Sequence, residues 1–431
     1  MTQLISVGIG QCGVQMTSTF TEYYMKEAQT FPTSEACQRF FYETSNNKFI
    51  ARTVLIDTES KVVDQIIQQS SGPSIWSYDK HSIWAQGSGA RNNWAVGFTL
   101  EDSSIRNKVM ERLQHQAEKC DRFGGFLMFQ SLAGGTGSGL GSRITESVRD
   151  YFGVKAHLVN TVVWPYQAGE VMVQSYNSVL SLACLLKNSD AVCLTYNDVL
   201  HQICSKTNGE DSVNFQDMNI IIAKMLSGMV LPSRSVCTVP LWSQPLSHLA
   251  SLPSRRLFSL FSLPIISENA KSFSMYNWES LINNVVSMTA TGNYDGQNIA
   301  SIQRLADPRS KPIKKCDSLW MVLRGAETKE GKLRANECNL FQSEKFFAKD
   351  NPDPLLVSSH PKHCFGFEKS VTIMANSQAI VDPLDDLLNK IHLMLESGAY
   401  LYQYIEAGVD KEWIDEDRLF LEQVLNEYKN M

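Results

Sequence analysis

The sequence predicts an α/β fold with a mostly parallel sheet in its N-terminal half, a central helix, a smaller α/β region and two C-terminal helices. Short apolar runs rich in β-branched residues alternate with amphipathic stretches in the first half, which is typical of the strands and helices of a parallel sheet. A long apolar stretch then ends before Pro232, and apolar residues at helical spacing return near the C-terminus.

Four apolar runs of the first half predict buried strands, at residues 4–7, 53–56, 126–129 and 157–163. Helical patterns between and after these runs predict helices at residues 11–26, 105–120, 140–151, 173–186 and 199–205. Open sheets built in this way bind ligands at the carboxyl ends of their strands.

The second half begins with a predicted apolar helix at residues 215–230, because Pro232 cannot continue a helical hydrogen-bond ladder. Strands at residues 318–323 and 370–374 follow in a weaker α/β pattern, and helices at 384–406 and 415–428 close the chain. We therefore expect a domain at 1–214, a central helix at 215–232, an intermediate α/β domain at 233–382 and a helical hairpin at 383–431.

Composition argues against several classes of protein. The net charge is −6, which gives no basic field for nucleic-acid binding. No apolar run approaches the roughly 20 residues of a membrane span, so no membrane partner is expected. The ten cysteines contain no Cys-x-x-Cys pair, which favours reduced thiols and a soluble, intracellular protein.

The strongest local signal is a glycine-rich segment that follows the strand at 126–129 and precedes a helix. Glycines let the backbone approach an anion closely, and unpaired amides at a helix N-terminus favour phosphate. Neither the Walker lysine nor dinucleotide-type glycine spacing occurs in this segment. The alternative interpretation of this glycine-rich segment is a flexible surface turn. The candidate phosphate-binding residues are Ala133, Gly134, Gly135, Thr136, Gly137, Ser138 and Gly139.

A second glycine cluster, Gly8-Ile9-Gly10-Gln11-Cys12-Gly13, also follows a strand and opens a helix. Alone it is consistent with a tight connection, but two such junctions can converge on one ligand.

These motifs resemble those of the tubulin superfamily. Residues 133–139 resemble its signature loop, residues 10–15 resemble its N-terminal motif, and the similarity continues through Asn92-Asn93, Tyr176-Asn177-Ser178 and Arg324-Gly325. The chain is identified as a member of this superfamily. Trp164-Pro165-Tyr166 and Gly169-Glu170-Val171 resemble its delta branch, with the epsilon and zeta branches as alternatives.

The resemblance implies a site for GTP or GDP with Mg²⁺. It implies Gln11, Cys12 and the glycine loop at the phosphates, with Asn92 at the terminal phosphate. Asp57 and Glu59 match the acidic pair near Mg²⁺, although a solvated strand end is the alternative. The remaining implied contacts are Gln15, Asn197 and Asn219 at the guanine, Phe215 stacked on the base, and Glu170 at the ribose.

Three positions depart from the family pattern. Gln244 falls where a glutamate would activate water on a neighbouring subunit's GTP, and an amide cannot accept that proton. We therefore expect no catalytic residue and weak or absent GTPase activity. Gln174 and Tyr196 replace acidic residues near the sugar, which predicts a weaker preference for GTP.

The resemblance implies a GTP-binding cytoskeletal protein of the cytoplasm, at centrioles and basal bodies, that serves in assembly or maintenance of triplet microtubules. The implied partners are alpha-, beta-, epsilon- or zeta-type tubulins and centriolar proteins. A GTPase switch that regulates tubulin assembly is an alternative. A dinucleotide-dependent enzyme is a more remote alternative, because no arrangement of catalytic residues is evident in the sequence.

Overall fold

The computed structural model describes residues 2–32, 35–70, 75–85, 89–100, 103–169, 171–208, 213–233, 243–250, 252–266, 277–292, 313–338, 341 and 346–431. Within these residues, no helix is long and apolar enough to cross a membrane.

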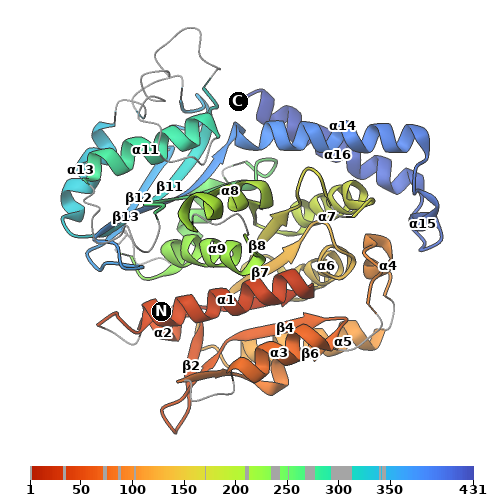
Figure 1. Cartoon of the computed structure of the whole chain (residues 1–431), viewed down its shortest axis with the longest axis horizontal. Coiled ribbons are helices and arrows are strands. Elements are labelled where there is room, and N and C mark those ends of the chain that lie inside the picture. Colours follow the sequence, from red (N-terminus) through yellow and green to blue (C-terminus); the bar gives the residue numbers. More distant parts are fainter. Residues whose placement is uncertain are drawn as a thin grey trace.

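A ten-stranded sheet runs through the molecule in the order β12-β11-β13-β10-β9-β8-β7-β1-β4-β6 (Figure 1). All neighbouring strands are parallel except around β13, which is antiparallel to both β10 and β11. Its strands are β1 Gln3–Ile9, β4 Thr53–Asp57, β6 Ile83–Ala85, β7 Phe123–Ser131, β8 His157–Trp164, β9 Ala191–Tyr196, β10 Leu257–Leu263, β11 Cys316–Gly325, β12 Leu355–His360 and β13 Lys369–Ser377.

A second, three-stranded sheet consists of β2 Phe41–Glu43, β3 Phe49–Ala51 and β5 Trp76–Tyr78. The helices are α1 Gly10–Ala28, α2 Glu35–Gln38, α3 Ser60–Ser70, α4 Trp94–Phe98, α5 Ser103–Glu118, α6 Gly141–Phe152, α7 Gln174–Asn188, α8 Asn197–Asn208, α9 Phe215–Val230, α10 Ser243–Leu249, α11 Trp278–Thr291, α13 Thr328–Glu337, α14 Val381–Ser397, α15 Tyr402–Ile405 and α16 Lys411–Lys429. A single π-helical turn, η2 Thr136–Leu140, leads into α6.

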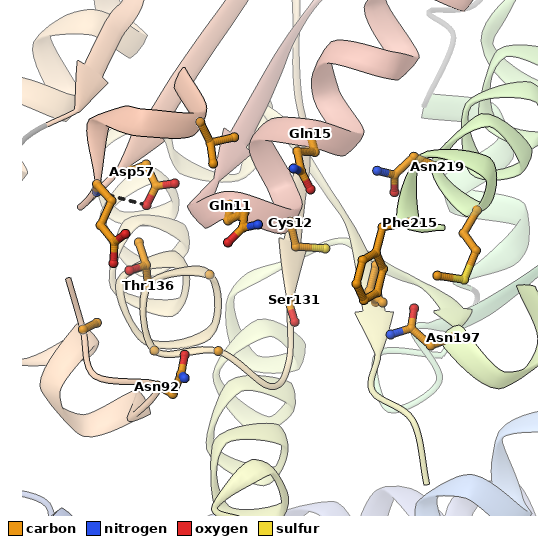
Figure 2. A pocket seen from close by; sticks show the side chains of 18 of the residues that line it. Gln11, Cys12, Gln15, Asp57, Asn92, Ser131, Thr136, Asn197, Phe215 and Asn219 are labelled. Atoms are coloured by element: carbon orange, nitrogen blue, oxygen red, sulfur yellow. Dashed lines mark hydrogen bonds between the residues drawn. The ribbon is translucent and has the colours of Figure 1, made fainter. Parts of the chain in front are cut away.

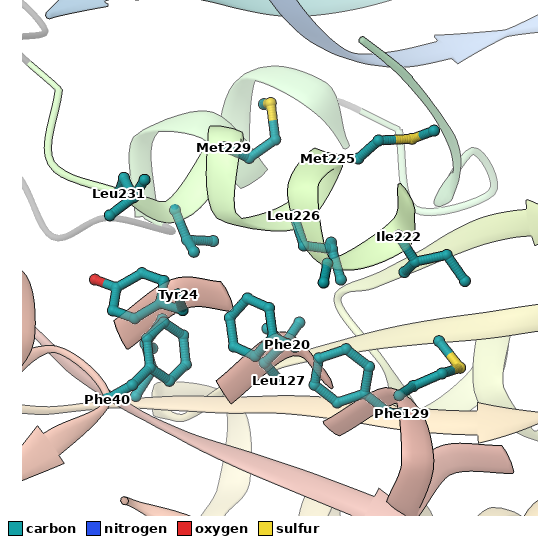
Figure 3. Packing of buried hydrophobic residues seen from close by; sticks show 14 of the residues in the cluster. Phe20, Tyr24, Phe40, Leu127, Phe129, Ile222, Met225, Leu226, Met229 and Leu231 are labelled. Carbon is teal, nitrogen blue, oxygen red and sulfur yellow. The ribbon is translucent and has the colours of Figure 1, made fainter. Parts of the chain in front are cut away.

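Helix α9 packs along α1, and both cover one face of the sheet (Figure 3). Between them, Phe20 and Tyr24 of α1 face Leu226 and Met229 of α9, and all four side chains are buried. Phe129 of β7 packs against Phe20, with ring centroids 5.4 Å apart. This packing holds the N-terminal ends of α1 and α9 beside the carboxyl ends of β1 and β7.

Both ends of α9 are capped. Asn214 and Asp217 form a capping box at its start, in which each side chain accepts from the other residue's backbone N–H. At its end, the buried Arg324 donates to the carbonyls of Gly228, Leu231 and Pro232 at 2.7–2.8 Å. Arg39 donates to the Val230 carbonyl. The central helix is therefore fixed at both termini by polar contacts.

The C-terminal helices α14 and α16 lie side by side and pack against α7 (Figure 1). Leu421, Val424, Leu425 and Tyr428 are buried, as their helical spacing predicts. The Tyr428 hydroxyl lies 2.9 Å from Asn376 Oδ1 and joins α16 to β13.

The structure confirms the α/β class, and each predicted strand lies within an observed one. The single helix predicted at 384–406 is wrong. Gly398 adopts φ 66°, a left-handed conformation that ends α14, and the chain turns before α15. The helix predicted at 140–151 is observed as α6, Gly141–Phe152, and the separate π-helical turn η2 precedes it from Thr136. The division into domains stays a prediction.

Candidate functional site

A cavity of about 470 Å³ opens at the carboxyl ends of the central parallel strands. This volume falls within the range of about 300–1,000 Å³ that is common for small-molecule sites. Residues from both glycine clusters and from the starts of α8 and α9 surround it (Figure 2). The lining residues are Gln11, Cys12, Gln15, Asp57, Glu59, Val62, Ala90, Arg91, Asn92, Ser131, Gly134, Gly135, Thr136, Gly137, Val163, Asn197, Leu200, Phe215, Met218, Asn219 and Ile222.

Two helix N-termini approach the middle of this cavity. Helix α1 begins at Gly10, directly after β1, and the turn η2 begins at Thr136, after β7. Gly10 has φ 70°, and a Cβ built on it would lie 2.7 Å from the Gly137 nitrogen. Only glycine permits this contact, so the two clusters meet because both are glycine-rich. Their exposed amides and helix dipoles favour an anion.

The glycine loop also lies against the segment before α4. A Cβ on Gly135 would lie 2.4 Å from the Ala90 carbonyl oxygen, and a Cβ on Gly139 would lie 2.1 Å from the Trp94 carbonyl oxygen. Arg91 and Asn92 both have left-handed backbones, with φ 49° and 52°. The close approach brings Asn92 into the lining of the cavity, below Thr136 in the view of Figure 2.

One end of the cavity carries two carboxylates. Asp57 ends β4 and is 4% exposed, and its Oδ1 accepts from the Glu59 backbone N–H at 3.4 Å. Burial raises the pKa of Asp57 to about 6, and the nearby Glu59 carboxylate adds to this shift. Thr58 Oγ1 lies 2.6 Å from Thr136 Oγ1, which ties this strand end to the glycine loop. Within the described part of the chain, no salt bridge neutralises either carboxylate.

The other end of the cavity has amide side chains and an aromatic ring. Asn197 is the first residue of α8, and Asn219 lies one turn into α9 with 8% exposure. Phe215, the first residue of α9, is 56% exposed, and its ring lies between the two amides (Figure 2). A flat, half-open face bordered by amide donors and acceptors suits a planar heterocycle with polar edges.

Gln11, Cys12 and Gln15 of α1 lie between the two ends (Figure 2). Burial raises the pKa of the Cys12 thiol to about 12, and its Sγ contacts Met16 Sδ at 3.7 Å. Cys12 therefore stays a neutral thiol at physiological pH, which suits a position beside an anion better than a thiolate would.

The structure gathers most of the predicted site residues around this cavity, and three of the loop residues lie outside it. Ala133, Ser138 and Gly139 do not line the cavity. The Ser138 hydroxyl donates to the Gly134 carbonyl, because Ser138 belongs to the helical turn η2 and faces back along it. Glu170 lies outside the described residues. Gln244 is on α10 and does not line the cavity.

Sequence reasoning missed several lining residues. Ser131 is the last residue of β7, and the rule that ligands bind at the carboxyl ends of strands could have identified it. Arg91 has no comparable signal, because its position depends on the left-handed turn beside Asn92. The apolar residues Val62, Val163, Leu200, Met218 and Ile222 carry only a core-like pattern in sequence.

The residues fit a purine nucleotide. Glycine amides and two helix N-termini lie between a carboxylate pair and an amide-and-aromatic end, in the order that magnesium, phosphates and base would require. Among the described residues, no group of three His, Cys, Asp or Glu side chains is placed to hold a metal. A cation at Asp57 and Glu59 would therefore need further oxygen ligands from phosphate and water.

The fold and the cavity are those of a nucleotide-binding α/β protein, with two glycine-rich helix N-termini at the middle of the cavity. Residues 3–205 match the GTPase domain of the Tubulin/FtsZ family. The chain is 30% identical to the Tubulin delta chain of Canis lupus familiaris, over 99% of this chain and 100% of that protein. It belongs to the tubulin family, and guanine nucleotide is its ligand class.

Other relatives span the chain equally. The Tubulin delta chain of Homo sapiens is 28% identical over 99% of this chain and 100% of its own length. The Tubulin beta-2 chain of Geotrichum candidum is 25% identical over 100% of this chain and 94% of its own length.

Proposed function

We propose that this chain is a delta-type tubulin that binds GTP or GDP with Mg²⁺ and serves in assembly or maintenance of the triplet microtubules of centrioles and basal bodies. Its partners in this proposal are alpha-, beta-, epsilon- or zeta-type tubulins and centriolar proteins. The observation that carries the proposal is full-length similarity to proteins named Tubulin delta chain. It is supported by a cavity lined by a carboxylate pair, two glycine-rich helix N-termini, and amide and aromatic side chains.

Each end of the cavity has a proposed role. The amides of Gly134, Gly135 and Gly137, with Gln11 and Cys12, hold the phosphates, and Asn92 contacts the terminal one. Asp57 and Glu59 hold Mg²⁺, directly or through water. Gln15, Asn197 and Asn219 recognise the guanine edge, and Phe215 stacks on the base.

A binding test separates guanine selectivity from general nucleotide binding. Thermal unfolding is measured with Mg²⁺ and GTP, GDP or ATP, because a ligand at 100 times its dissociation constant stabilises a protein by roughly 2.7 kcal/mol. We expect GTP and GDP, but not ATP, to raise the melting temperature of the protein freed of bound nucleotide. Asn219→Ala should reduce this shift, and Asn389→Ala on the exposed side of α14 is the matched control. Equal shifts with ATP and GTP would refute guanine recognition.

Hydrolysis is a separate question. Gln244 lies on α10 and does not line the cavity, so any role of Gln244 in hydrolysis would concern the GTP of a neighbouring subunit. We expect the wild-type chain to add no phosphate release above that of alpha- and beta-tubulin alone, and Gln244→Glu to increase it. Rapid release by the wild-type chain would instead favour a GTPase switch.

The cellular role is tested in a cell that builds triplet microtubules. A tagged chain should localise to centrioles or basal bodies, and electron microscopy after its depletion should show doublets where triplets belong. Intact triplets after complete depletion would contradict the delta-type assignment and favour an epsilon- or zeta-like role.

A further inference from the structure

Asn177, on the first turn of α7, lies behind the phosphate end of the cavity and is fully buried. It does not line the cavity. Its Nδ2 donates to the Asn92 carbonyl at 2.9 Å and to the Ala133 carbonyl at 2.6 Å. One side chain therefore joins the two segments that approach the phosphate end, the Asn92 turn and the start of the glycine loop.

The other side of the amide is equally occupied. Asn177 Oδ1 accepts from the Trp94 backbone N–H at 2.8 Å and from the Tyr404 hydroxyl at 2.6 Å. Both donors and both acceptor sites of the amide are thus in use. The orientation is fixed by chemistry, because the carbonyls of Asn92 and Ala133 can only accept and the Trp94 amide can only donate.

Tyr404 brings in a distant part of the chain. It lies in α15 of the C-terminal region, is fully buried, and packs its ring 4.9 Å from the Tyr176 ring. The Tyr176 hydroxyl donates to the Ala399 carbonyl, just after α14, at 3.0 Å. Trp413 of α16 packs edge-on against Trp94 at 5.9 Å. The C-terminal helices therefore contact the same segment that Asn177 holds.

The Asn92 turn needs external support. Arg91 and Asn92 are consecutive left-handed residues, a conformation that costs free energy in non-glycine residues and persists only where neighbours enforce it. Asn177 bonds the Asn92 carbonyl, and the Asn93 side chain caps α4 by accepting from the Ala95 and Val96 amides. Asn177 thus joins this turn to the glycine loop by hydrogen bonds, in addition to the close approach of Gly135 to Ala90.

We propose that Asn177 is a positioning residue for the terminal phosphate of the nucleotide, and that Tyr404 makes its geometry depend on the C-terminal helices. The inference rests on the proposed function, since it assigns a terminal phosphate to the Asn92 end of the cavity. The affinity for GTP, which has that phosphate, depends on the Asn177 network (Asn177, Asn92, Ala133, Trp94 and Tyr404). The affinity for GDP depends on this network much less. A ligand that moves α15 would in turn change the preference for GTP over GDP.

The test uses Tyr404→Phe, which removes one hydroxyl and keeps the ring. Its matched control is Tyr428→Phe, because Tyr428 is an equally buried tyrosine of the same helical region whose hydroxyl meets Asn376 Oδ1 far from the loops. Affinities for GTP and GDP are measured with Mg²⁺ by competition with a fluorescent nucleotide. We expect Tyr404→Phe to lower the GTP-to-GDP affinity ratio about three- to tenfold, on the scale of one hydrogen bond, and Tyr428→Phe to leave it unchanged. Equal ratios in all three proteins would overturn the proposal.

A second measurement needs no nucleotide. Amide hydrogen exchange of residues 89–98 and 133–139 should be faster in nucleotide-free Tyr404→Phe than in wild type, and unchanged in Tyr428→Phe. Asn177→Asp, which keeps the acceptor and removes both donors, should accelerate the same amides further. If the wild-type chain binds neither nucleotide, the proposed function fails, and the exchange pattern alone decides whether the network positions these loops. Unchanged exchange in Tyr404→Phe and Asn177→Asp would overturn it.

Discussion

Asp57 shows how a single residue can favour binding over stability. Its carboxylate is 4% exposed at the end of β4, beside the acidic Glu59 and without a salt bridge among the described residues. Burial raises its pKa from 3.8 to about 6, so the folded state holds its proton more tightly than the unfolded chain does. Stability is therefore lost as pH rises from about 4 through 6, and at pH 7 the full cost of the buried charge is present.

Asp57→Asn should therefore stabilise the nucleotide-free protein. A shift of about two pKa units corresponds to a gain of up to about 3 kcal/mol in the free energy of unfolding at pH 7, with roughly half of it left at pH 5. Urea denaturation at the two pH values measures this, with Asp64→Asn on the exposed side of α3 as the control. The same variant should lose Mg²⁺-dependent nucleotide affinity. A loss of stability at pH 7 would show that the Asp57 charge is compensated.

Gly135 lies where the glycine loop meets the segment before α4, so a substitution there tests this contact. Its φ of −80° and ψ of −51° suit alanine, so only space opposes a side chain there. Because a Cβ would lie 2.4 Å from the Ala90 carbonyl oxygen, Gly135→Ala should lower the free energy of unfolding of the nucleotide-free protein by about 1–3 kcal/mol. Gly134→Ala, where a Cβ meets nothing within 4 Å, should cost little in the same denaturant titration. Equal stability of the two variants would disprove the close approach.

At the scale of elements, helix α9 depends on its C-terminal cap. Arg324 is 1% exposed, and burial lowers its pKa. The three carbonyls it meets, with the negative end of the helix dipole, offset the cost of the buried charge.

Arg324→Lys should destabilise the protein by about 3 kcal/mol, because an ammonium group cannot replace a guanidinium that donates to three separate carbonyls. Arg256→Lys is the comparison, since Arg256 donates to the single carbonyl of Ser189 at 3.0 Å and should lose less than about 1 kcal/mol. Urea denaturation of both variants measures the difference. A similar loss in the two would mean that Arg324 does not hold the end of α9.

The strands and helices of the first half follow the sequence pattern because alternation and glycine junctions are local signals. Strand β9 escaped prediction, since Ala191–Tyr196 is a short apolar run that periodicity cannot distinguish from a buried helix. The order of the strands in the sheet also cannot be predicted from local sequence patterns. Pairing of β9 with β10 joins Val192 to Leu257, and only the folded chain brings these residues together.

In the candidate site, too, some residues were predictable from local sequence patterns and others were not. The glycine-rich part of the cavity was predictable from strands followed by glycines, whereas Asn197, Phe215 and Asn219 were named only through the family resemblance. The positions of Phe215 and Asn219 depend on the packing of α9 against α1, a contact between residues about 200 positions apart. Asn197 begins α8 directly after β9, and its position depends on the order of the strands. Ser138 was assigned to the phosphates as part of the glycine-rich segment, and its hydroxyl donates to the Gly134 carbonyl within the helical turn that begins at Thr136.

For the whole molecule, the C-terminal helices share one apolar core with the nucleotide-binding part. Buried residues of α14 and α16 join Leu180 and Leu185 of α7 and Leu194 of β9 in one cluster. A salt bridge between the half-exposed Lys187 and the buried Asp417, at 2.5 Å, crosses the same boundary. The helical hairpin therefore has no separate core on which to fold, although the sequence pattern marks it as a distinct segment.

A matched pair of leucines on α16 tests this shared core. Leu421 is fully buried and Leu419 is 44% exposed. Leu421→Ala should cost about 2–5 kcal/mol and Leu419→Ala less than about 0.5 kcal/mol. Because the cluster continues into α7, Leu421→Ala should lower the melting temperature of one cooperative transition in calorimetry, and α7 amides should exchange faster together with those of α16. Two transitions, of which only one shifts, would show that the helical hairpin unfolds independently, and the link from α15 to the phosphate loops would then have to act without a common core.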